Sequence, residues 1–159
     1  MTRTTRAPQL PTRDVPMAIS NVDIDTTALR EHLFDHSAGA LVTFEGWVRD
    51  HNEGREVVAL DFDVYKPLAI AEGVRIIAEV SERYGVRQVL AVHRDGSLTL
   101  GGCAVWDVVV SAHRYVAFKA CRDIFDRIKV DLPILKKEHY SDGDSGWVNC
   151  ERCASHAHG

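Results

Sequence analysis

Three lysines surround the point where a predicted helix ends and a predicted strand begins. The segment from Arg127 to Glu138 reads RIKVDLPILKKE and contains Lys129, Lys136 and Lys137 around a proline. At 100° per residue, Lys129 falls at the edge of its helix's apolar stripe. It also falls in the last turn, where the helix dipole favours a cation. Such a lysine either takes part in chemistry or only extends its amine past apolar neighbours to water.

Lys136 and Lys137 are adjacent on a predicted extended segment, so their side chains point to opposite faces. One of them can therefore face the same hollow as Lys129 while the other faces water. Two amines in one hollow repel each other, which lowers their pKa and favours an anion between them. The alternative is a set of separate, solvated lysines.

A second group of cations stands where a predicted strand leads into a helix. His113 and Arg114 follow the strand and begin the segment HRYVAFKA. A helix start offers unpaired backbone N–H groups to an anion, and an arginine adds a bidentate donor for phosphate or carboxylate. One alternative is that His113 and Arg114 only form a polar turn, and another is that Ser111 caps the helix.

Arg49 begins a third polar segment, Arg49–Asp50–His51–Asn52, at the end of a predicted strand. Loops at strand ends carry binding sites more often than strand interiors do. Together with the helix-end residues, Arg49 gives the chain several cations at the ends of its elements. From the residues alone, this pattern predicts binding of an anionic small molecule, with lysine-assisted chemistry.

The last ten residues contain a possible metal site. Cys150 and Cys153 have C-x2-C spacing, with His156 and His158 behind them. Closed zinc sites usually draw pairs of ligands from two separated elements, whereas these four residues lie within nine positions. We therefore predict no metal and no cofactor, and keep a zinc-binding tail as an alternative.

The composition is that of an ordinary globular domain. The chain has 159 residues, 45% hydrophobic and 26% charged, with a formal net charge of −4. An acidic balance argues against general nucleic-acid binding. No apolar run approaches the roughly 20 residues that a membrane-spanning helix needs, and the start lacks an apolar signal segment. We expect a cytoplasmic protein with a flexible lead at 1–17, one domain at 18–150 and a short Cys/His-containing tail at 151–159.

Three helices and several strands are expected to position the cations. The first helix is expected within 25–39, capped by Asp25 or Thr26, with an apolar side at Leu29, Leu33 and Phe34. Strands are expected near 40–50, 57–65, 87–94, 104–112 and 133–140, with the first two pairing with each other.

A second helix is expected at 68–84, with Gly85 after its end, and a third at 114–130, ending by about Asp131 before Pro133. The second helix's apolar positions are Leu68, Ala71, Val74, Ile77, Ala78 and Val80. The buried stripe of the third is expected to hold Ala117, Cys121, Ile124 and Ile128. These elements predict an α+β fold with a mainly antiparallel sheet and three helices.

The order of these motifs resembles the large, catalytic subunit of molybdopterin synthase, the MoaE family. The motifs are GALVTFEGWVRDHNEG, VLAVHRDGSLTLGG, the long VVVSAHR…KKE segment and GWV, which together span roughly Ser37 to Val148. The resemblance implies a fold of the α/β-hammerhead type. It also implies transfer of sulfur to cyclic pyranopterin monophosphate, which forms the dithiolene of molybdopterin. The sulfur arrives as a thiocarboxylate on the C-terminal Gly-Gly of a small ubiquitin-like carrier.

The resemblance also implies roles for the five cations. Lys129 matches the essential lysine that meets the carrier's C-terminal glycine, and Lys136 matches a second active-site lysine that also binds substrate. Arg49 matches the arginine of a substrate-binding loop. His113 and Arg114 match a substrate-binding pair contributed by the other protomer of a homodimer, which binds one small subunit at each end as a heterotetramer. Two alternatives remain: a non-catalytic homologue that only docks a ubiquitin-like carrier, and a small zinc-binding module.

Overall fold

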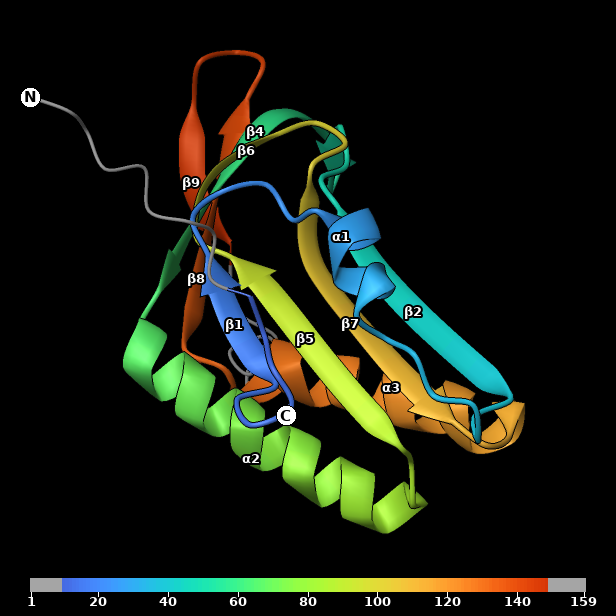
Figure 1. Ribbon diagram of the computed structural model, residues 1–159. Coiled ribbons are helices and arrows are strands. Elements are labelled where there is room, and N and C mark those ends of the chain that lie inside the picture. Colours follow the sequence, from blue (N-terminus) through green and yellow to red (C-terminus); the bar gives the residue numbers. More distant parts are fainter. Residues whose placement is uncertain (1–9, 149–159) are drawn as a thin grey trace, which may run out of the picture.

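The computed structural model describes residues 10–148, which form two β-sheets and three helices (Figure 1). The first sheet has the order β1–β5–β7–β2, comprising β1 (Met17–Ser20), β5 (Gln88–Arg94), β7 (Cys103–Ser111) and β2 (Ala40–Trp47). Its β1–β5 pair is parallel and its other pairs are antiparallel. The sequence pattern did not predict β1.

The second sheet has the order β3–β4–β8–β9, with β6 on the other side of β4. Its strands are β3 (His51–Asn52), β4 (Arg55–Val64), β8 (Ile134–Tyr140), β9 (Ser145–Val148) and β6 (Gly96–Thr99). All its pairs are antiparallel. With helices α1 (Thr26–Glu31), α2 (Lys66–Tyr84) and α3 (Arg114–Asp131), the predicted α+β class with three helices and mainly antiparallel strands is confirmed.

The predicted pairing of the strands near 40–50 and 57–65 is wrong. β2 pairs with β7, whereas β4 pairs with β3, β6 and β8. The reason is the hairpin between β3 and β4. Glu53 and Gly54 both have positive φ, 49° and 79°, as a two-residue turn of this kind requires, so β4 finds its hairpin partner in β3.

Helix α1 is much shorter than predicted, although its predicted cap is confirmed. The side chain of Asp25 accepts a hydrogen bond from the backbone N–H of Ala28. The helix ends at Glu31, and Phe34 lies 73% exposed beyond it. Asp35 accepts hydrogen bonds from the N–H and hydroxyl of Ser37, and this local turn competes with continuation of the helix.

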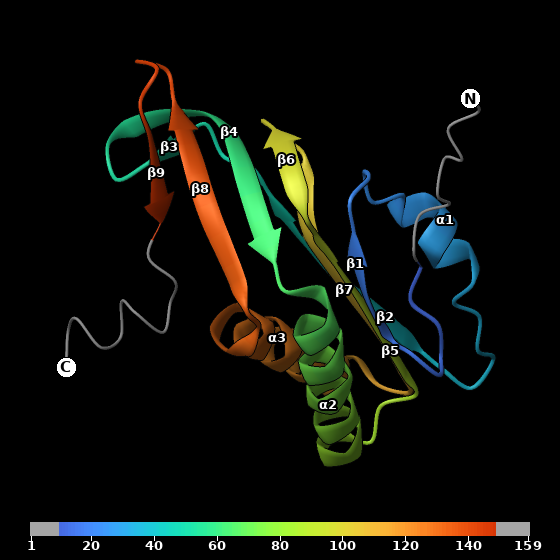
Figure 2. The same ribbon diagram turned by 90° about the vertical axis from the view of Figure 1, so that its left-hand side faces the viewer.

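Helices α2 and α3 cover one face of the first sheet, and α1 lies on the other (Figure 2). The predicted stripe of α3 is confirmed, since Ala117, Cys121, Ile124 and Ile128 are all buried. For α2 the predicted stripe is partly wrong. Ile77 and Val80 are buried and Val74 is partly buried against the core, whereas Leu68, Ala71 and Ala78 are exposed; the other buried positions are Ala69, Gly73 and Ile76. Gly73 packs against Met17 of β1, which turns the buried side of α2 toward that strand.

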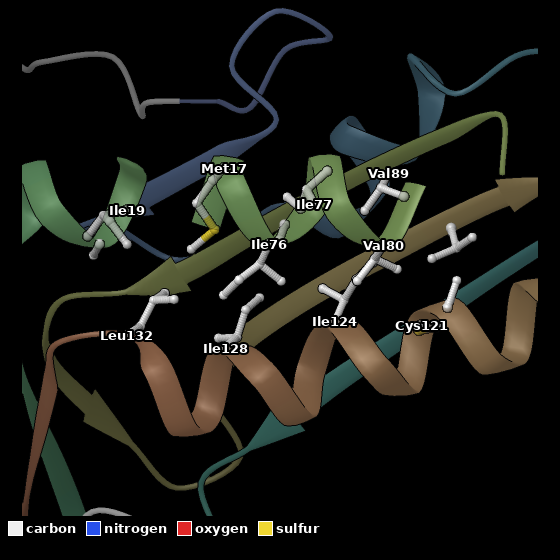
Figure 3. Packing of buried hydrophobic residues seen from close by; sticks show 14 of the residues in the cluster. Met17, Ile19, Ile76, Ile77, Val80, Val89, Cys121, Ile124, Ile128 and Leu132 are labelled. Carbon is white, nitrogen blue, oxygen red and sulfur yellow. The ribbon is translucent and has the colours of Figure 1, made fainter. Parts of the chain in front are cut away.

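The main core fills the space between these two helices and the sheet (Figure 3). Ile76 and Val80 of α2 meet Ile124 and Ile128 of α3 there, and all four are at most 2% exposed. Leu132 extends the core past the end of α3. Burial of this stripe fixes the rotation of α3, and hence the side of the helix on which Lys129 emerges.

The passage from α3 to β8 takes only two residues. The N–H of Leu132 bonds to the carbonyl of Ile128, and the N–H of Ile134 bonds to the carbonyl of Leu132. The carbonyl of Pro133 accepts from the N–H of Tyr65, just before α2. Proline disfavours helix at the residue before it, so the chain leaves α3 where the sequence predicted and enters β8 at once.

Candidate functional site

Lys129 and Lys136 stand on either side of the short α3–β8 connection. Lys129 lies in the last turn of α3 and is exposed, whereas Lys136 is half-buried in β8. Across the sheet, Lys136 is opposite Phe62 of β4 and Val148 of β9. The burial of Leu132 anchors the connection between the two lysines. The structure thus brings them to the two ends of one tight, anchored turn.

Lys137 occupies the opposite side of β8. Its partners across the sheet are Asp61 and Trp147, and its Nζ lies 5.7 Å from the ring centroid of Trp147. Asp61 also accepts hydrogen bonds from Ser97 (2.5 Å) and His139 (2.6 Å), which lower its pKa. Lys137 therefore lies among the polar groups of the outer face, and Lys136 faces the other way.

Arg49 is connected to the strand that carries Lys136. It follows β2 and is exposed, and its Nη2 lies 3.5 Å from Oδ1 of Asn52. The Nδ2 of Asn52 donates to Oε1 of Glu138 at 2.8 Å. Glu138 is two residues beyond Lys136 on the same face of β8, so the Arg49 loop is held against that strand.

Glu138 is a site residue that sequence reasoning missed. Its side chain is only 4% exposed, and the hydroxyl of Tyr140 donates to it at 3.3 Å besides the amide of Asn52. A buried carboxylate is kept only where donors satisfy it. The signal in the sequence was an acidic residue directly after two lysines, and its meaning depends on a loop 86 residues away.

His113 and Arg114 lie at the opposite end of α3. His113 is the N-cap residue, but its side chain makes no capping hydrogen bond. The alternative in which Ser111 caps the helix is wrong, because Ser111 is the buried last residue of β7. His113 and Arg114, with Tyr115 and Phe118, line an open hollow of about 330 Å³.

One copy of the chain does not bring the two cation groups together. Fifteen residues separate Arg114 from Lys129 on the same straight helix, a distance of roughly 22 Å at 1.5 Å per residue. A small ligand cannot touch both. The structure therefore divides the predicted residues into a group near Lys136 and a group at the start of α3.

The described cysteines are poor nucleophiles. Burial, with the nearby Glu45, raises the pKa of Cys103 to about 11. Burial and the carboxylate of Asp107 raise the pKa of Cys121 still further. A thiol reacts as its thiolate, so neither of these residues is suited to carry sulfur at neutral pH.

The predicted absence of a metal concerns mainly the tail, which lies outside the described residues, as do Cys150, Cys153, His156 and His158. Within residues 10–148, no three His, Cys, Asp or Glu side chains group as metal ligands. Nor does this part of the chain include a helix long and apolar enough to cross a membrane.

Known proteins match this chain along most of its length. The family model described as MoaE protein matches residues 19–131. The molybdopterin synthase catalytic subunit of a Nostoc species is 38% identical over 75% of this chain and 73% of its own length. The rice subunit of the same name is 36% identical over 76% of this chain, which spans 63% of that longer protein.

The fold agrees with these sequence matches. The structure of molybdopterin synthase from Staphylococcus aureus superposes with a TM-score of 0.78 at 32% identity, covering 87% of this chain and 98% of the other. The family model covers four of the five predicted cations, namely Arg49, His113, Arg114 and Lys129, and ends five residues before Lys136. The chain belongs to the MoaE family, the family of molybdopterin synthase catalytic subunits.

Proposed function

We propose that this chain transfers sulfur to cyclic pyranopterin monophosphate as the catalytic subunit of a molybdopterin synthase. The sulfur donor is the C-terminal thiocarboxylate of a small ubiquitin-like carrier subunit, and two sulfurs form the dithiolene of molybdopterin. The observation that carries the proposal is the pair Lys129 and Lys136 on either side of one anchored turn in a chain of this family.

Lys129 is the residue that meets the carrier's C-terminal glycine. A thiocarboxylate is an anion, so a cationic helix end attracts it. Transfer of its sulfur leaves a carboxylate on the carrier and passes through oxyanionic intermediates. An ammonium group at that point stabilises the developing charge or moves a proton. Since Lys129 is exposed, a partner's tail can reach it without opening the core.

Lys136 and Arg49 hold the pterin substrate. The contacts from Arg49 through Asn52 to Glu138 keep the arginine's loop beside β8, where Lys136 also lies. The substrate is an anion, and both side chains carry a positive charge and hydrogen-bond donors for its polar groups. Glu138 acts as a positioning residue, because its buried carboxylate is bonded to Asn52 and Tyr140.

His113 and Arg114 complete the site from a second copy of the chain. The roughly 22 Å along α3 separates them from Lys129 within one copy. A second α3 lying antiparallel beside the first would bring its start near Lys129. We therefore infer a homodimer with two composite sites, in which one carrier subunit at each site makes a heterotetramer.

Reconstitution tests the proposed activity. The purified chain is mixed with cyclic pyranopterin monophosphate and the carrier subunit, either thiocarboxylated or with an ordinary C-terminal carboxylate. We expect dithiolene product only with the thiocarboxylated carrier. If the chain binds the carrier but forms no product, the docking-only homologue is the correct interpretation. If it does not bind the carrier at all, the proposed partnership is wrong.

A further inference from the structure

The hollow at the start of α3 combines two cations with two exposed aromatic rings. Tyr115 and Phe118 are 66% and 63% exposed, and they line the hollow together with His113 and Arg114. Most of the hollow's exposed lining is apolar. Leaving two large rings in water on one turn of helix is unfavourable, and such exposed apolar surface usually marks a binding site.

The cations of this hollow have no partners in the described part of the chain. Within residues 10–148, neither His113 nor Arg114 forms a side-chain hydrogen bond or an ion pair. The other arginines of α3 differ, since Arg122 and Arg127 each pair with a carboxylate on α3 or α2. Arg114 is therefore available to an external anion, directly beside the aromatic rings.

Lys119 adds to this arrangement. Its Nζ lies 4.6 Å from the centroid of the Tyr115 ring, a cation–π distance. The contact holds the tyrosine ring against α3 and adds a third positive charge near the hollow. A ligand that suits these groups has a flat, π-electron-rich part and an anionic part close together.

We propose that Tyr115 and Phe118 form a surface on which the pterin ring lies, while His113 and Arg114 hold the phosphate. This inference rests on the proposed function. It assigns recognition of the pterin ring to two aromatic residues that are not among the five predicted cations. Fused heteroaromatic rings stack well on aromatic side chains, and the stacking does not depend on hydrogen-bond pattern. The volume, about 330 Å³, is at the lower end of the range for small-molecule sites.

The proposed surface fits the composite site described above. Tyr115 and Phe118 are on the same turns of α3 as His113 and Arg114, so they enter the site with them from the second copy. The phosphate then lies at the cations, and the ring extends over Phe118 toward the lysines of the first copy. Phe118 thereby becomes a determinant of specificity for a pterin over other phosphates.

Equilibrium binding to the full chain tests this inference. Binding of cyclic pyranopterin monophosphate is measured by calorimetry, and binding of a matched oxidised pterin phosphate by its fluorescence, for wild type, Phe118→Leu, Tyr115→Leu and Arg114→Ala. Phe118→Leu keeps apolar volume but removes the ring. We expect it to raise the Kd by about tenfold, as the loss of one stacking partner predicts.

Two controls separate ring recognition from other effects. Phe34→Leu changes another exposed phenylalanine, whose ring packs edge-on against His36, and should leave the Kd unchanged. A cyclic phosphate ester without a pterin ring should bind wild type and Phe118→Leu with equal affinity. It should bind Arg114→Ala more weakly than wild type. Sedimentation of each variant reports whether the dimer persists.

Failure of the proposed ring surface can be told apart from failure of the proposed sulfur transfer. An unchanged Kd for Phe118→Leu, with wild type forming product, overturns the ring surface and leaves the sulfur transfer standing. Dissociation of the Phe118→Leu dimer, with loss of affinity for both probes, also overturns it, because the ring then serves subunit contact. Weaker pterin binding by a dimeric variant supports the inference even if wild type forms no product.

Discussion

The amide of Asn52 and the carboxylate of Glu138 are joined at 2.8 Å, although 86 residues separate them in sequence. The bond ties the loop that carries Arg49 to the strand that carries Lys136. Glu138 is 4% exposed, so its carboxylate depends on the donors around it. Two of the proposed substrate ligands, Arg49 and Lys136, are thus held in place through a hydrogen bond formed within the chain itself.

Asn52→Ala should weaken both the fold and substrate binding. The substitution removes one donor from a buried carboxylate, which costs about 1–3 kcal/mol of unfolding free energy. It also frees the Arg49 loop, so the substrate's Kd should rise while the carrier's Kd stays the same. Urea unfolding and pterin binding measure the two effects.

Arg55→Ala provides the control for that experiment. Arg55 lies opposite Asn52 in the same hairpin, but its side chain pairs with Asp142 and Asp144 and forms no side-chain hydrogen bond with Arg49 or Asn52. Its loss should leave the substrate's Kd unchanged. If Asn52→Ala and Arg55→Ala weaken substrate binding equally, the specific role of the Asn52–Glu138 pair is wrong.

Lys136→Ala and Lys137→Ala should differ sharply. The two side chains leave β8 on opposite faces, and Lys137 is opposite Asp61 and Trp147 on the outer side. We expect Lys136→Ala to reduce the single-turnover rate at least tenfold and Lys137→Ala to change it less than threefold, magnitudes typical of losing a charge-stabilising contact and a peripheral one. Rapid-quench assays at saturating carrier measure both. A larger loss of rate for Lys137→Ala than for Lys136→Ala would place the outer face of β8 in the site.

The Asp107 carboxyl should make stability depend on pH. Asp107 is fully buried in β7, and burial raises its pKa from 3.8 to about 7. Between these values the unfolded chain releases the proton while the folded chain keeps it. Stability therefore falls as pH rises from about 4 to 7, by up to about 1.4 kcal/mol per unit, and levels off above that.

Asp107→Asn should remove that component of the pH dependence, since the amide stays neutral in both states. Urea midpoints at pH 5 and pH 8 measure it for the variant and wild type. Asp126→Asn, an exposed carboxylate on α3, is the control and should behave as wild type. If Asp107→Asn keeps the wild-type difference between the two pH values, Asp107 is not the group responsible.

Gly73→Ala should destabilise the contact between α2 and β1. A Cβ at this position would lie 2.4 Å from Cγ of Met17, a buried side chain. The resulting strain should cost about 1–3 kcal/mol, more than the gain in helix propensity. Combining it with Met17→Ala should cost less than the sum of the two single changes, because the smaller side chain removes the clash. Additive costs in urea unfolding would contradict this contact.

The sequence predicted those features that depend on nearby residues. The end of α3 before Pro133, the left-handed Gly85 after α2 and the cap at Asp25 each follow from a few adjacent side chains. The pairing of β4 with β8, by contrast, joins residues at least 70 positions apart, and no local pattern encodes it.

The candidate site divides in the same way. The cations could be selected from residue type and position at element ends. The separation of Arg114 from Lys129 also follows from the predicted helix at 114–130, which α3 confirms. The role of Glu138, by contrast, depends on the distant Asn52, so it could not be predicted from spacing along the chain.

The most direct test of the account is single-turnover sulfur transfer by Lys129→Ala beside wild type. Thiocarboxylated carrier and cyclic pyranopterin monophosphate are supplied to both, and carrier binding is measured in parallel. The account predicts dithiolene product from wild type and almost none from the variant, with carrier binding intact. Equal product from both would contradict it and move the catalytic role away from Lys129.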